Sequence, residues 1–338
     1  MNFLPAEWYP QSFVQLTFPH AETDWQPMLE EAEDCFLNIA REISLRENLL
    51  IVAPNIEAVK EKLIGRNIDI RPIQFFACPT NDTWARDHGG ITVFRNGKPT
   101  VLDFKFNGWG LKFAANYDNL ITSKLFEAGG GAGYQYENHL NFVLEGGSIE
   151  SDGKGTLLTT SECLLSPNRN GEWNKQQIEN YLKKTFNLQQ ILWLNHGFLQ
   201  GDDTDSHIDT LARFCSEDTI AYVKCEDETD IHFFELKKME DELKTFRMLH
   251  NQPYKLIPLP MADAIYHDGE RLPTTYANFL IINGAVLYPT YNQPENDKRA
   301  SEVLASAFPD REIVGIDCTA LIKQHGSLHC VTMQYPKN

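Results

Sequence analysis

One arrangement of residues recurs along this chain and restricts the folds that it can adopt. A polar cluster comes first, then two β-rich runs around a tight turn, and later a helical pattern. Four such hairpin patterns lie at 89–106, 147–160, 211–223 and 276–291, around the turns NGK, DGKG, SED and NG. A fifth polar cluster, HGSLHC, precedes the last apolar run. We therefore expect five similar units of mixed strand and helix.

Five marker residues, one in each polar cluster, define the length of the repeat. They are Asp87, Glu145, His207, Asn278 and Cys330, and their separations are 58, 62, 71 and 52 residues. Repeats of this kind around an axis form a propeller-like closed shape, in which the same end of each unit faces one central site. Residues far apart in the sequence are then expected to converge.

Helical patterns alternate with the hairpins. Apolar residues at three- and four-residue spacing predict helices at 24–43, 56–65, 174–186 and 295–308. The glycine-rich stretch at 127–134 lacks the patterns of phosphate-binding loops and predicts only a flexible connection.

The composition narrows the classes of partner. The chain has 47 acidic and 30 basic residues, and its formal net charge is −17. This charge argues against nucleic acid or an anionic membrane as the partner and favours a cationic ligand or none. No stretch approaches the roughly 18 consecutive apolar residues of a membrane-spanning helix. The seven cysteines show no CxxC spacing, so we expect neither disulfides nor a zinc site, and a cytoplasmic location.

The marker positions carry side chains suited to nucleophilic catalysis. Cys330 supplies a thiol, and His207 supplies an imidazole that can move protons near neutral pH. Three carboxylates accompany them, on Asp87, Glu145 and Asp209. One carboxylate can orient the imidazole, and the other two would be costly to bury together unless a planar cation such as a guanidinium lay between them. The set therefore predicts attack of a thiolate on a cationic carbon.

Two simpler interpretations remain open at this point. A single cysteine is more often a small core residue than a nucleophile. The acidic segment GDDTDSHID can also be read as a divalent-metal cluster. Its candidate ligands are Asp202, Asp203, Asp205, His207 and Asp209. No second cluster rich in histidine or carboxylates completes such a site, so we expect neither a metal nor another cofactor.

The motifs taken together resemble those of the agmatine deiminase family. In chain order they are NDTWARDHGG, FNGWG, LEGGSIESDGKGTLL, DDTDSHIDTLARF, YANFLIING with LYPTYNQPEND, and GSLHC. The resemblance extends from PAEW at 5–8 to Cys330. The family belongs to the guanidino-modifying superfamily, so the resemblance implies the pentein fold: a five-bladed pseudo-symmetric α/β propeller of strand-strand-helix-strand units, with residues 1–338 as one catalytic domain.

The resemblance also implies roles for individual residues. Cys330 matches the nucleophile of the family, and His207 matches its general acid and base. Asp87 and Asp209 match the carboxylates that hold the guanidinium. Glu145 matches the carboxylate on the far side of the histidine.

Two further positions match the substrate pocket. Trp84 resembles a pocket wall, with core packing as the alternative role. Asp203 matches an acidic position that faces the distal amine of agmatine, with a turn or cap role as the alternative. The chain departs from the family at HIDT and QHGSLHC, where many members have HxDN and GGGNIHC, and these departures affect the shape of the pocket.

The expected activity is the hydrolysis of agmatine to N-carbamoylputrescine and ammonia through a covalent thiouronium intermediate on Cys330, by a monomer or a homodimer. A peptidylarginine or free-arginine deiminase would use the same chemistry, and Arg86 or Arg213 could then bind the carboxylate of free arginine. A pentein that only binds its ligand is the alternative outside enzymes, and the complete Cys, His and carboxylate set argues against it.

Overall fold

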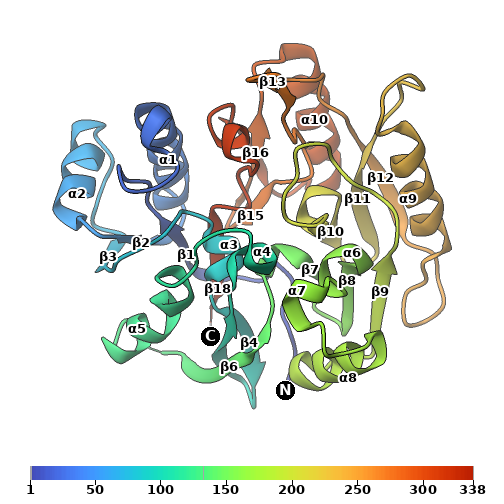
Figure 1. Cartoon of the computed structure of the whole chain (residues 1–338), viewed down its shortest axis with the longest axis horizontal. Coiled ribbons are helices and arrows are strands. Elements are labelled where there is room, and N and C mark those ends of the chain that lie inside the picture. Colours follow the sequence, from blue (N-terminus) through green and yellow to red (C-terminus); the bar gives the residue numbers. More distant parts are fainter. Residues whose placement is uncertain (1, 132, 338) are drawn as a thin grey trace.

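The computed structural model describes residues 2–131 and 133–337, and five sheets built on one pattern contain most of its strands. In each sheet two strands run antiparallel, and a further strand joins the second of them in parallel. A helical connection leads from each second strand to its parallel neighbour, because parallel strands need a long crossover. Figure 1 shows the sheets following one another around the middle of the molecule, with the longer helices toward the outside.

The first sheet joins the two ends of the chain. Its strand order is β18-β1-β2-β3, and these strands are Thr332–Pro336, Gln11–Thr17, Asn48–Ala53 and Ile73–Ala77. Two helices connect the parallel strands, α1 (Leu29–Ser44) and α2 (Ile56–Gly65). Because β18 is the last strand, this sheet is complete only after the C-terminal segment has folded back onto β1 (Figure 1).

The other four sheets have three strands each. Their strands are β4 (Ile91–Arg95), β5 (Lys98–Lys105) and β6 (Gln135–Val143); β7 (Ile149–Ser151), β8 (Thr156–Thr160) and β9 (Gln190–Leu194); β10 (Ala212–Ser216), β11 (Thr219–Lys224) and β12 (Lys255–Pro260); and β15 (Leu280–Ile282), β16 (Ala285–Thr290) and β17 (Glu312–Asp317). Their longer connecting helices are α5 (Ile121–Glu127), α8 (Lys175–Phe186), α9 (Phe233–Thr245) and α10 (Pro294–Ala307). Shorter helical turns are η1 (Gln26–Met28), α4 (Gly108–Leu111), η2 (Asp118–Leu120), α6 (Ser161–Leu164), α7 (Pro167–Asn170) and η5 (Leu321–Gln324).

The hairpins and helices predicted from the sequence are confirmed. The four hairpin patterns form β4–β5, β7–β8, β10–β11 and β15–β16. The predicted helix at 56–65 is α2, and the other three predicted helices match α1, α8 and α10. Local signals explain these boundaries. Asn174 and Gln177 form a capping box at the start of α8, and α10 begins at Pro294, where a missing N–H does no harm.

The structure also contains features that the sequence patterns did not predict. The helix α9 is one, and a small hairpin of β13 (Tyr266–His267) and β14 (Glu270–Arg271) outside the repeat is another. The predicted connection at 127–134 lies between α5 and β6, but Ala132 falls outside the described residues. Among the described residues no strand pairing joins one of the five sheets to the next, so no continuous ladder of backbone hydrogen bonds closes the sheets into a ring.

Apolar packing holds neighbouring sheets together instead. Val14 and Leu49 of the first sheet share a buried cluster with Leu287 of the last sheet. Leu158 of β8 and Phe214 of β10 share another cluster. Burial of this apolar surface is the main term that favours the arrangement. None of the helices in the described part of the chain has the length and apolar character needed to span a bilayer.

The pairing of β18 with β1 generates a prediction about stability. The ring of Tyr335 is 1% exposed, stacks on Phe13 at 4.3 Å between centroids and donates a hydrogen bond to Gln15 Oε1 at 2.9 Å. We expect Tyr335→Ala to lower the free energy of unfolding by about 3–5 kcal/mol, as for other large core deletions. Tyr266→Ala, at a tyrosine that is 63% exposed in β13, should change it by less than about 0.5 kcal/mol. Urea unfolding measures both values, and equal losses would show that the β1–β18 contact is not a stabilising core contact.

Candidate active site

The predicted site residues lie at the entrance to the first strand of a sheet. Asp87 belongs to α3 (Ala85–His88), which precedes β4. Glu145 caps η3 (Gly146–Ser148), which precedes β7. His207 caps η4 (Ile208–Thr210), which contains Asp209 and precedes β10. Cys330 lies two residues before β18. Equivalent ends of four sheets therefore supply these side chains.

Cys330 is a buried thiol between an amide and a carboxylate. Its Sγ lies 3.4 Å from Asn278 Oδ1 and 3.9 Å from Asp209 Oδ2, and the residue is 5% exposed. Burial, together with the charges of Asp209 and Asp87, raises the pKa of the thiol well above its usual value. Without a cation in the site, Cys330 is therefore a thiol and a weak nucleophile.

The two carboxylates beside the thiol are held in different ways. Asp87 accepts the indole N–H of Trp109 at 2.9 Å and the backbone N–H of Gly147 at 3.0 Å. Asp209 Oδ2 lies 2.7 Å from His329 Nδ1, whereas its buried Oδ1 has no hydrogen-bond partner in the described part of the chain. Burial and Asp209 raise the pKa of Asp87. For Asp209, burial acts to raise the pKa, but contact with His329 outweighs burial and the pKa is lowered.

His207 is an imidazole without a hydrogen-bond partner among the described residues. It is 1% exposed, and burial lowers its pKa to about 3. Its Nδ1 lies 3.6 Å from Asp87 Oδ1. The imidazole is therefore neutral near pH 7, and among the described residues neither ring nitrogen has a hydrogen-bond partner.

Glu145 is fully buried and lies close to His207, but its hydrogen bonds go elsewhere. Ligand atoms of Glu145, Cys163 and His207 lie within 4.8 Å of one another. The Glu145 carboxylate accepts from Arg169 Nε at 2.9 and 3.0 Å, and Arg169 also pairs with Asp205 at 2.5 Å. Burial raises the pKa of Glu145 and Arg169 opposes that rise. The predicted orienting contact of Glu145 with His207 thus remains a prediction, and Arg169 is a partner that the sequence analysis missed.

The double glycine of the LEGGS motif lets backbone pass through this crowded centre. A Cβ atom at Gly147 would lie 2.6 Å from His207 Nδ1 and 2.8 Å from Asp87 Oδ1. Gly146 has different neighbours: a Cβ atom there would lie 2.3 Å from the carbonyl oxygen of Arg86. No side chain fits at either position, so glycine is required for close approach of the backbone rather than for turn geometry.

A cavity of about 150 Å³ leads to Cys330 and Asp87. Its aromatic lining residues are Trp84, Trp109 and Phe113. Its other acidic lining residues are Asp24, Asp82 and Asp203. Neither lysine nor arginine lines this cavity, and an elongated cation is the ligand that suits aromatic walls with several carboxylates.

Asp203 and Trp84, the two predicted pocket residues, both line the cavity. Trp84 is 5% exposed and packs against Trp25 and Gly326, so it contributes to the core as well. Burial and the nearby Asp202 raise the pKa of Asp203 to about 6. Its carboxylate receives no hydrogen bond from another described residue, while its carbonyl oxygen accepts Lys112 Nζ at 2.5 Å.

The acidic segment does not form the metal cluster that its sequence allowed. Asp202 accepts hydrogen bonds from Thr204 and Ser206, and Asp205 pairs with Lys112 and Arg169. The donor groups close enough to share an ion are two other sets. They are Glu145, Cys163 and His207, and Glu7, Glu150 and His329. In each set an arginine already pairs with the carboxylates, Arg169 in the first and Arg213 in the second. The guanidinium groups thus supply positive charge to these carboxylates.

Arg86 and Arg213, the proposed carboxylate ligands of an arginine-specific enzyme, lie outside this cavity. Arg213 is fully buried, pairs with Glu7 and Glu150, and donates to the carbonyl oxygens of Ala277 and Phe279. Arg86 faces Glu7 at 3.6 Å.

Sequence reasoning missed several residues that contact the site. They are Trp109, Gly147, Arg169 and His329; Asn278 was named only as a marker of the repeat, without its contact to the thiol. The FNGWG, LEGGS and HC motifs were visible, but only the folded chain shows which atoms of these motifs meet the carboxylates and the thiol.

The chain is similar to known proteins over nearly its whole length. The family model of the Porphyromonas-type peptidyl-arginine deiminase matches residues 3–336. A solved structure of an agmatine deiminase variant from C. jejuni with substrate bound is 41% identical, covers 100% of this chain and 97% of its own, and has a TM-score of 0.92. A Porphyromonas gingivalis structure named "Putative Arginine Deiminase" is 52% identical, covers 100% of this chain and 99% of its own, and has a TM-score of 0.94. 

A curated relative from Legionella pneumophila (strain Paris), named "Putative agmatine deiminase", is 33% identical over 99% of this chain and 96% of its own length. The resemblance to agmatine deiminases inferred from the motifs is confirmed by these matches. Because the family model spans nearly the whole chain, this protein belongs to the Porphyromonas-type peptidyl-arginine deiminase family.

Proposed function

We propose that this protein is an agmatine deiminase, which hydrolyses agmatine to N-carbamoylputrescine and ammonia. One observation carries the proposal. Asp87 and Asp209 place two buried carboxylates beside a buried thiol, at the end of a cavity that no lysine or arginine lines. Among the described residues no lysine or arginine side chain balances these carboxylates from the cavity, and a guanidinium would supply positive charge with N–H groups directed at both carboxylates. The similarity to a substrate-bound agmatine deiminase from C. jejuni supports this substrate.

The substrate itself activates the nucleophile in the proposed mechanism. Asp87 and Asp209 hold the guanidinium flat against Cys330, and its positive charge lowers the pKa of the thiol. Neutral His207 takes the thiol proton, Sγ attacks the central carbon, and His207 returns the proton to the departing nitrogen. Ammonia leaves and a thiouronium remains on Cys330. His207 then deprotonates a water that attacks the same carbon, and the C–S bond breaks.

The distal amine of agmatine is proposed to bind Asp203. Agmatine carries a second positive charge at its far end, and Asp203 lines the cavity without touching the reacting groups. Asp24 and Asp82 add negative charge to the same cavity, and Trp84 would pack against the aliphatic part of the substrate. Arg86 and Arg213, the arginines considered as ligands for the carboxylate of free arginine, do not line this cavity.

The family name favours a second candidate, a peptidylarginine or free-arginine deiminase. The three substrates share the guanidinium chemistry and differ only at the far end, so the cavity mouth decides between them. We further infer that the five sheets form the blades of one pentein propeller and one catalytic domain over residues 1–338, since they share one strand pattern and apolar packing connects them. A cytoplasmic location, the absence of a nucleic-acid partner and a homodimer belong to the same proposal.

Substrate choice provides the direct test. Ammonia release should be fastest with agmatine, and slower with free arginine and with an arginyl peptide at equal concentration. Cys330→Ser should abolish it by orders of magnitude, because a hydroxyl is a far poorer nucleophile in this site. Rapid quenching and mass spectrometry of the wild-type protein should find one adduct, on Cys330. A preference for arginine or for the peptide would transfer the proposal to the second candidate.

The role of Asp203 predicts a pH dependence. Because its pKa is raised to about 6 by burial and by Asp202, the carboxylate is charged above that pH and becomes neutral as the pH falls through it. We expect kcat/KM for agmatine to fall on this acid limb. Asp203→Asn should lower kcat/KM at neutral pH by about 30- to 3000-fold, the equivalent of ~2–5 kcal/mol, and should flatten the limb. Asp82→Asn is the matched control in the same cavity, and an equal effect there would place the amine elsewhere.

Gly147 provides a third test. Gly147→Ala should reduce kcat about 100-fold or more, since its Cβ would displace His207 or Asp87 and displacements near 1 Å have such effects. Gly65→Ala is the control, because nothing lies within 4 Å of a Cβ there. Steady-state kinetics and circular dichroism of both variants make the comparison, and near-normal kcat in Gly147→Ala would contradict the assigned positions of His207 and Asp87.

A further inference from the structure

His329 lies between two carboxylates directly behind the nucleophile. Its Nδ1 is 2.7 Å from Asp209 Oδ2, and its Nε2 is 2.6 Å from Glu7 Oε2. The imidazole is 1% exposed. Glu7 comes from the N-terminal segment, 322 residues away in sequence, so this contact connects the two ends of the chain beneath the active site.

Glu7 is itself held from several sides. Its Oε1 accepts the backbone N–H of Ile281 at 2.7 Å, and its Oε2 accepts Arg213 Nη2 at 3.0 Å. Arg86 Nη2 lies 3.6 Å from the same oxygen. Burial acts to raise the pKa of Glu7, but the charges of His329 and Arg213 outweigh burial and the pKa is lowered. Glu7 is therefore a carboxylate.

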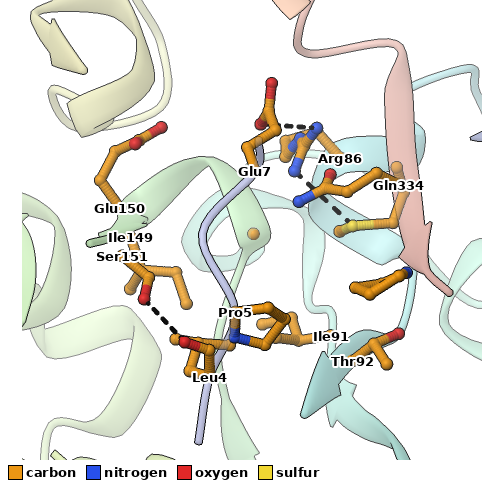
Figure 2. Close-up of a pocket in the computed structure, with 13 residues that line it drawn as sticks. Leu4, Pro5, Glu7, Arg86, Ile91, Thr92, Ile149, Glu150, Ser151 and Gln334 are labelled. Atoms are coloured by element: carbon orange, nitrogen blue, oxygen red, sulfur yellow. Dashed lines mark hydrogen bonds and ion pairs between the residues drawn. The ribbon is translucent and has the colours of Figure 1, made fainter. Parts of the chain in front are cut away.

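A second cavity, of about 50 Å³, lies beside this carboxylate. Figure 2 shows Glu7 and Glu150 at one end of it, with Arg86 paired to Glu7. Gly146 lines this cavity, whereas Gly147 contacts His207 and Asp87. The double glycine thus separates the second cavity from the active site, and Glu7 acts on the site only through the residues that it contacts.

Hydrogen-bond directions determine how Glu7 acts. The charged groups that face His329 are Asp209, Glu7 and Arg213, with Arg86 and Glu150 beyond them. A guanidinium has no acceptor, so Arg213 Nη2, which lies 3.0 Å from both Glu7 Oε2 and His329 Nε2, can only donate. Each ring nitrogen of His329 lies within hydrogen-bond distance of one carboxylate, Nδ1 of Asp209 and Nε2 of Glu7. His329 occupies Asp209 Oδ2, and only the unpartnered Oδ1 remains for a ligand.

We propose that His329 and Glu7 are positioning residues that hold Asp209 ionised, with one oxygen occupied and the other free for the guanidinium. This inference rests on the proposed function. It assigns a role to the histidine before the nucleophile and to an N-terminal glutamate, neither of which touches the substrate. Loss of a hydrogen bond to a charged group of this kind changes affinity by about 10- to 100-fold.

Two alkylating agents test the inference without turnover. The rate of Cys330 alkylation by a small cationic chloroamidine, divided by the rate with neutral iodoacetamide, reports the charge of Asp209 and Asp87 rather than the reactivity of the thiol. Glu7→Gln keeps the shape of the side chain and removes its charge. We expect this variant to lower the ratio about tenfold and to raise KM for agmatine more than it lowers kcat.

Glu150→Gln is the matched control. Glu150 is a buried carboxylate that pairs with Arg213 and makes no hydrogen bond with His329 among the described contacts. The ratio of the two alkylation rates in Glu150→Gln should stay within about threefold of the wild-type ratio. If Glu7→Gln and Glu150→Gln lowered the alkylation-rate ratio equally, loss of any nearby buried charge would explain the effect, and the inference would be wrong.

Substitution of His329 tests the other half of the pair. His329→Asn retains a side-chain N–H for Asp209 and should keep most of the cationic preference, whereas His329→Ala should lose it. An unchanged ratio in His329→Ala would overturn the inference. A wild-type preference for the chloroamidine without agmatine turnover would reject the proposed function but leave this inference standing, while no preference in the wild type would reject both. Circular dichroism of each variant verifies the fold.

Discussion

Two buried carboxylates, Asp87 and Asp209, lie beside a buried thiol, and among the described residues no lysine or arginine lines the adjoining cavity. Much of the surrounding structure offsets the cost of that arrangement. Buried charge is unfavourable unless hydrogen bonds or opposite charge compensate it. Trp109 and the backbone of Gly147 donate to Asp87, and His329 holds Asp209. The compensation is incomplete, and in the proposed function the guanidinium of the substrate supplies the remaining positive charge.

The architecture explains how such a site can be built from distant segments. Equivalent ends of successive sheets point to one region, and three of the sheets contribute one or two side chains from, or directly before, a short helical turn that precedes their first strand. Apolar packing between sheets keeps these turns in place. Precise placement matters because each site side chain lies against several polar or charged neighbours. The two ends of the chain complete the arrangement, since β18 pairs with β1 and Glu7 reaches His329.

Local patterns in the sequence predicted a large part of this molecule. The hairpins, the helices α1, α2, α8 and α10 and the choice of Cys330, His207, Asp87 and Asp209 follow from turn chemistry, periodicity and the repeated polar clusters. The sequence analysis did not find α9, and it did not anticipate that the carboxylate of Glu145 bonds Arg169; the expected contact of Glu145 with His207 stays a prediction. Pairings between residues far apart in sequence leave no local pattern, which is why Arg169 and His329 were missed.

The sequence by itself determined which chemical groups are present and which secondary structures carry them, because propensities, turns and apolar spacing act over a few residues. Only the tertiary structure decided which oxygen of Asp209 is free and that Glu7 stands behind His329. It also decided that Arg86 and Arg213 face the core rather than the cavity. These outcomes depend on distances of a few ångströms between segments that are hundreds of residues apart, and packing of the complete fold sets such distances.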